Sequence, residues 1–159
     1  MLWSIKVGDA IMLCALSNYA DQTINPGESA VFTVFEVPCD TRYVRTRLGT
    51  GLIMLSGRGG CPCRQTVNYL VDFGADVAIP EGGTVVPITV SIAVNGSNIP
   101  SGTMTVTPAA AEDYFNISKA IVADVWRGCC ETLTITNTST QPITMRNASL
   151  LIDKPERNR

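Results

Sequence analysis

Short runs in which apolar and polar residues alternate are the feature that most constrains how this 159-residue chain folds. In residues 87–94, isoleucine and valine alternate with threonine, serine and alanine, and residues 103–107 and 132–136 place threonines between apolar residues. An alternation with period two is typical of antiparallel strands that bury one face. We therefore expect an all-β domain of about eight to ten strands, arranged as a sandwich or barrel.

The segments between these runs carry turn signals. The Asn95-Gly96 pair indicates a hairpin, with a loop longer than two residues because the next alternating run starts at Thr103. The alanine-rich residues 107–114 are too few for an isolated helix, so we expect a connection or a single turn there. Residues 11–16 are apolar, but they follow Asp9 and precede no clear cleavage site, which favours a strand over a signal peptide.

The composition argues against catalysis. The chain contains no histidine, which removes the commonest general base and every Ser-His or Cys-His pair. The acidic pairs Glu112-Asp113 and Asp72 with Asp76 lie in no recognisable catalytic motif. We predict that the protein is not an enzyme, has no catalytic or cofactor-binding residues and uses no cofactor.

Charge and hydropathy exclude two further classes of partner. The net charge is −2, and the nearest approach to a basic block is the group Arg42, Arg45 and Arg47, so nucleic-acid binding is not expected. No apolar run approaches the roughly 18 residues needed to span a bilayer, so membrane insertion is not expected either.

Six cysteines offer two readings. Cys61-Pro62-Cys63 and the adjacent Cys129 and Cys130 do not have the spacing of a structural zinc site, so no metal ligand is predicted. A disulfide between one of Cys61 or Cys63 and one of Cys129 or Cys130 is one alternative. Free buried thiols, as in a protein that matures in a reducing cytosol, are the other.

Several segments of the second half resemble a known group of domains. The resemblance covers about residues 85–153 and rests on the segments 90–96, 99–108, 114–118, 126–128 and 146–152. These resemble the C-terminal head domains of collagen-like bacterial surface and exosporium proteins, and related domains encoded in prophages of gut Firmicutes. Those heads are similar to the C1q and tumour-necrosis-factor (TNF) fold. The resemblance implies an antiparallel jelly-roll β-sandwich that assembles as a tight homotrimer.

Two features shape the functional expectation. Charged residues make up only 16 % of the chain, against about 25 % in typical domains, which suits a protein that hides much of its surface in an oligomer. No collagen-like Gly-X-Y stalk precedes the head, which fits a small virion protein better than a spore filament.

We therefore expect a non-catalytic structural protein of a phage virion: a trimeric capsid decoration, head-fibre or appendage protein that is assembled in the bacterial cytoplasm. Its partners would be its own copies, a capsid or other virion protein and, in a secondary role, surface glycans. The alternative is a spore-coat or cell-surface head domain that binds a carbohydrate or a receptor.

The expected organisation has three parts. Residues 1–16 form an N-terminal segment that acts as an anchor or an edge strand, residues 17–153 form the jelly roll, and residues 154–159 form a charged tail. Leu2, Trp3 and Ile5 are candidate docking residues, because apolar side chains ahead of the sandwich are costly to leave in water.

Overall fold

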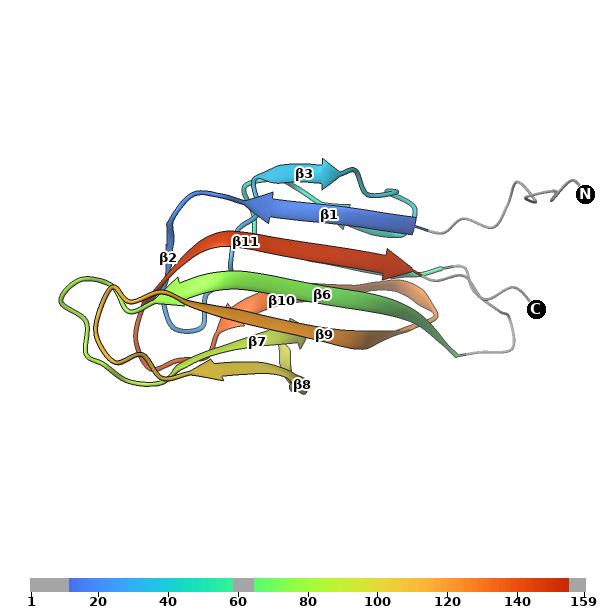
Figure 1. The fold of residues 1–159 in the computed structure, drawn as a ribbon. Helices are drawn as coiled ribbons and strands as arrows, with labels where there is room; N and C mark the ends of the chain where they lie inside the picture. The colour runs from blue at the N-terminus through green and yellow to red at the C-terminus, as the bar shows by residue number, and fades with distance from the viewer. Residues whose placement is uncertain (1–11, 59–64, 155–159) are drawn as a thin grey trace, which may run out of the picture.

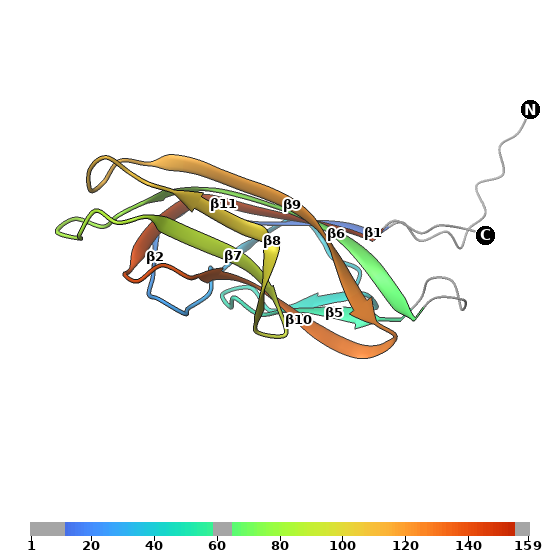
Figure 2. The same cartoon turned by 90° about the horizontal axis from the view of Figure 1, so that it is seen from below.

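The computed structural model describes residues 12–58 and 65–154, which form eleven antiparallel strands in two stacked sheets and, within these ranges, no helix (Figures 1 and 2). Sheet A has the order β3 (Val34–Val37), β1 (Met12–Asn18), β11 (Ile143–Lys154), β6 (Thr66–Ala78) and β9 (Phe115–Trp126), with β2 (Gln22–Ile24) also paired to β11. Sheet B has the order β4 (Val44–Thr46), β5 (Ile53–Gly57), β10 (Gly128–Asn137), β7 (Ile88–Val94) and β8 (Ser97–Val106). The prediction of an all-β sandwich is confirmed.

The core lies between the sheets and follows from the alternation along each strand. In β6 every second residue from Val67 to Val77 is buried, and β7 contributes Ile88, Val90 and Ile92 from the opposite sheet. Each large apolar side chain among them stabilises the fold by about 1.5–3 kcal/mol relative to exposure. The buried Tyr69 also links the sheets, because its hydroxyl donates to the Ser56 carbonyl of β5 at 2.6 Å.

Strand β11 lies at the centre of sheet A and brings both ends of the described chain together. It pairs with β1 from Met12↔Lys154 to Asn18↔Ala148, and with β6 along its other edge. Strand β1 therefore crosses the boundary expected at residues 16 and 17, and it is not an edge strand because β3 pairs along its other side. Lys154 is likewise buried in β11 rather than part of a tail.

The β7–β8 hairpin differs from the expectation. Its loop is only Asn95 and Gly96, both with positive φ (51° and 78°), as a tight type I′ turn requires. Strand β8 begins at Ser97 but bulges: Asn98 pairs with Ala93, whereas Thr103 pairs with Ser91. The extra residues between these pairs interrupt the alternation, which is why the sequence shows a clear strand only from Thr103 onward. Residues 107–114 form no helix, as expected.

A buried amide fastens one end of the sandwich. Asn137 is 1 % exposed, and its Nδ2 donates to the carbonyls of Ile24 (2.9 Å) and Gln141 (3.0 Å). Its Oδ1 accepts from the backbone N–H of Ser139 at 2.9 Å. One side chain thus joins β2, β10 and the start of the connection to β11.

We expect Asn137→Ala to lower the free energy of unfolding by about 2–3 kcal/mol, because it leaves buried backbone groups without partners. Urea unfolding followed by circular dichroism measures the change. Asn98→Ala, at an exposed position, serves as the control and should stay within about 0.5 kcal/mol of the wild type. Equal midpoints for the Asn137 variant and the wild type would contradict the role given to this amide.

Candidate functional site

Only some of the residues predicted to form a docking site or a disulfide lie in the described part of the structure. Leu2, Trp3 and Ile5, and likewise Cys61 and Cys63, lie outside the described residues. The cysteines Cys129 and Cys130 are described and lie at the start of β10, on the edge that pairs with β5.

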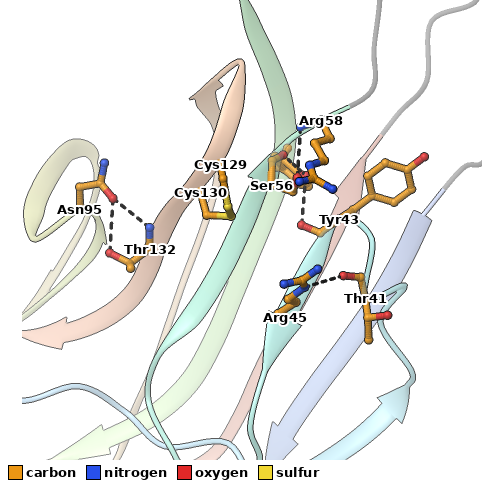
Figure 3. Close-up of a disulfide and its surroundings, with 10 residues drawn as sticks. Thr41, Tyr43, Arg45, Ser56, Arg58, Asn95, Cys129, Cys130 and Thr132 are labelled. Carbon is orange, nitrogen blue, oxygen red and sulfur yellow. Dashed lines mark hydrogen bonds between the residues drawn. A yellow bond between two sulfur atoms is a disulfide. The ribbon is translucent and has the colours of Figure 1, made fainter.

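Cys129 and Cys130 form a disulfide with each other (Figure 3). The predicted bridge to Cys61 or Cys63, and the alternative of free thiols here, are therefore wrong for these two residues. The reason is a bulge: Gly128 pairs with Gly57 but Glu131 pairs with Leu55, so β10 has one residue more than β5 over this stretch. The extra residue breaks the rule that neighbouring side chains point to opposite faces, and the two sulfurs can meet.

A second disulfide, which the sequence did not reveal, joins Cys14 of β1 to Cys39 after β3. Strands β1 and β3 are paired, which brings the Cα atoms to 4.6 Å across a sequence separation of 25 residues. Cys14 is fully buried and belongs to the core. The bridge therefore fastens the edge strand of sheet A to its neighbour.

The outer face of sheet A exposes large apolar side chains from four of its strands and from the edge strand β3. We call this set the apolar face; its members are Leu13, Val37, Leu70, Val122, Trp126 and Leu151. The strand register places Leu70 beside Val122, and it places Leu151 in one row with Ala15 and Val37. Asp153 separates Leu13 from Leu70, and Asp72 lies beside Leu151. Val122 and Trp126 project furthest, with exposed fractions of 60 % and 62 %.

Further along the strands, the same face is hollowed. Small residues, among them Ala15, Gly74, Ser118 and Ser149, leave an open depression of about 310 Å³. Asp72 and Glu36 also line it. The outer side of sheet A thus carries both a projecting apolar part and a recessed part.

Sheet B has a different outer surface. Its strands expose only one large apolar side chain among the described residues, Met54. On β10, Leu133 and Ile135 face the core, and the intervening hydroxyl side chains face outward. They line an open groove of about 520 Å³, called here the threonine groove, together with Ser29 and Asn98; its central members are Thr132, Thr134, Thr136 and Thr138.

Next to the threonine groove lies a small arginine pocket around the Cys129–Cys130 disulfide (Figure 3). Arg42, Arg45 and Arg58 line it, together with Tyr43, Met54 and Ser56. Arg42 binds Asp40 at 2.7 Å, and this hydrogen-bonded guanidinium lowers the pKa of the Asp40 carboxyl group. Among the described residues, no carboxylate pairs with Arg45 or Arg58. Arg45 Nε donates to the Thr41 carbonyl at 3.0 Å.

Comparison with solved structures identifies the fold. Murine APRIL at pH 5.0 superposes with a TM-score of 0.64 at 10 % identity, covering 91 % of this chain and 99 % of that chain. The globular domain of zebrafish complement 1qA gives 0.59 at 9 % identity (93 % and 98 % covered). Eiger TNF from S. frugiperda gives 0.57 at 11 % identity (94 % and 96 % covered). The fold is the C1q/TNF jelly roll.

The predicted C1q/TNF-like jelly roll is thereby confirmed. At 9–11 % identity the likeness concerns the fold alone. No protein-family model matches the sequence, and no curated protein sequence is significantly similar to it. In the described ranges, no helix is long and apolar enough to cross a membrane.

The two disulfides should differ sharply in their effect on stability. We expect the double variant Cys14→Ala, Cys39→Ala to lose about 3 kcal/mol of unfolding free energy, because its bridge closes a long loop in the unfolded chain. Cys129→Ser, Cys130→Ser should lose less than about 1 kcal/mol, because a bridge between neighbours closes almost no loop. Chemical denaturation measures both variants, and non-reducing peptide mapping checks the pairing. Similar losses for the two variants, or a different partner for Cys14, would refute this assignment.

Proposed function

We propose that this jelly roll is a non-catalytic structural protein that works as a homotrimer, displayed on a phage virion as a capsid decoration, head-fibre or appendage protein. The apolar face of sheet A carries the proposal. Large groups of exposed apolar side chains are uncommon on monomeric proteins and mark interaction sites. The resemblance of residues 85–153 to trimeric heads supports three copies as the occupants of this face.

The shape of the apolar face suits a rotational assembly. In a ring with three-fold symmetry, one patch of each copy meets a different patch of the next copy. The outer side of sheet A offers two such patches, because Val122 and Trp126 project while the depression around Gly74 recedes. Packing one against the other would remove apolar surface from water, at about 25 cal/mol per Å² buried.

The candidate catalytic carboxylates lie in positions that favour a structural role. Glu112 and Asp113 are exposed in the connection after β8, and Asp72 lies on the outer side of sheet A beside Leu151, its partner in β11. Exposed acids of this kind suit turns and strand faces, whereas general acid–base catalysis needs a group held within hydrogen-bond reach of the substrate.

The phage context rests on the resemblance to prophage-encoded heads. The alternative, a spore-coat or cell-surface head domain, shares the same fold and the same proposed trimer. Bonded cysteines persist outside a reducing cytosol, which fits a released virion and a bacterial surface equally. Mass spectrometry of purified virions distinguishes the two, because only a virion protein co-purifies with the capsid protein in constant ratio.

Light scattering at micromolar concentration should give about three times the 17.0 kDa chain mass. The double variant Leu70→Glu, Val122→Glu should be monomeric, because two carboxylates would replace a cross-strand apolar pair in the interface. Thr89→Glu, Thr105→Glu is the matched control: it introduces the same charges at a cross-strand pair of sheet B and should stay trimeric. A monomeric wild-type protein would contradict the proposed trimer. If the Leu70, Val122 variant is still trimeric, the apolar face is not the trimer interface.

The docking role of Leu2, Trp3 and Ile5 remains part of the proposal. Deletion of residues 2–7 should leave the trimer and its melting temperature nearly unchanged but abolish attachment to capsids. Burying Trp3 and its two aliphatic neighbours against a partner is worth on the order of 5 kcal/mol before ordering entropy is subtracted. Co-sedimentation with capsids measures attachment. If the truncated protein aggregates or dissociates into monomers, the segment belongs to the fold instead.

A further inference from the structure

The arginine pocket and the threonine groove form one continuous surface. Arg45 of β4 pairs with Met54 of β5, and Met54 pairs with Thr132 of β10, so a single cross-strand row joins the two. From Thr132 the groove follows β10 to its end at Asn137, for about 17 Å at roughly 3.3 Å per residue, and it continues to Thr138. The surface lies on sheet B, which the proposed trimer leaves open to solvent.

The pocket end of this surface is positively charged, although the chain as a whole carries −2. Asp40 compensates Arg42, whereas Arg45 and Arg58 have no carboxylate partner among the described residues. Arg45 donates its Nε–H to the Thr41 carbonyl, so the terminal N–H groups of Arg45 are available for a ligand. Guanidinium groups bind carboxylates and other oxyanions by paired, charge-assisted hydrogen bonds. This end of the surface therefore suits an anionic group.

The lining of the threonine groove indicates which class of anionic partner fits this surface. Its lining consists of hydroxyl and amide side chains and glycines, with no charged and no aromatic residue. A protein partner would need a buried aromatic or aliphatic anchor, and a nucleic acid would need stacking platforms and a longer basic track. Threonine and serine hydroxyls both donate and accept hydrogen bonds, as sugar hydroxyls do. A chain of sugars bearing acidic groups matches both parts.

We propose that this outer surface of sheet B binds an acidic polysaccharide, with its anionic groups at Arg45 and Arg58 and its sugar hydroxyls along Thr132, Thr134 and Thr136. Acidic polysaccharides are thus the ligand class proposed for the side of the molecule that the trimer would display. It does not depend on assembly, because each copy carries the complete surface.

The test is calorimetric titration of the full chain, at fixed low ionic strength, with heparin as the sulfated probe and polygalacturonate as the carboxylate probe. Binding of one probe or of both should be seen, and it identifies the preferred oxyanion; neutral dextran should not bind. Arg45→Gln, Arg58→Gln should weaken binding about tenfold. Arg47→Gln, Lys119→Gln carries the same net charge, changes residues outside the pocket and should stay within twofold.

A second pair of variants tests the groove itself. Thr134→Val removes one hydroxyl at nearly constant volume and should weaken binding about threefold, whereas Thr105→Val, outside the groove, should have no effect. Failure of both acidic probes to bind, or equal weakening by the two charge variants, would overturn the proposal. Equal affinity for poly-glutamate or single-stranded DNA would overturn the assignment to a polysaccharide. Light scattering of the same samples reports the trimer separately, so the two proposals fail independently.

Discussion

The pairing of β11 with its neighbours is the constraint on which the rest of the structure depends. This last strand joins β1 and β2 on one side to β6 on the other, so without it sheet A would separate into three pieces: β3 with β1, β2 alone, and β6 with β9. The pairing connects residues as distant as Met12 and Lys154, and it is therefore formed only after a large loss of chain entropy. Domains dominated by such non-local contacts fold slowly. The same pairing aligns Leu13, Leu70 and Leu151 on one surface.

How well each strand could be predicted depended on what its outward residues are. The runs that stand out in the sequence, at residues 87–94, 103–107 and 132–136, all belong to sheet B, where threonine and serine face outward. In sheet A several outward positions hold Leu70, Val122 or Leu151, so the contrast between the two faces is weak. The surface that makes sheet A a candidate interface is thus the reason its strands were harder to find.

The candidate site was predicted only in fragments, because its parts come from strands whose pairing the sequence does not state. Arg42, Arg45 and Arg47 lie close together in the sequence, yet the pocket combines two of them with Arg58 and a disulfide from β10. The Cys129–Cys130 disulfide depends on a bulge of a single residue. If the side chains of β10 alternated regularly between the two faces, these neighbouring cysteines would point apart and could not bond. Cys14 and Cys39 likewise meet only because β1 and β3 pair.

The chemical difference between the two outer faces has a consequence for how such a domain would bind. Exposed arginine–anion contacts are individually weak, of the order of 0–1 kcal/mol each, so one groove of this kind holds a polymer only loosely. A trimer built through sheet A would present three grooves on the outside. A long polysaccharide that reaches two of them binds the second site intramolecularly, and overall affinity then rises by orders of magnitude without any new contact. A groove that binds weakly is therefore sufficient for a displayed trimer to hold a polysaccharide tightly. A monomer with a single groove would need a deeper site to reach the same affinity.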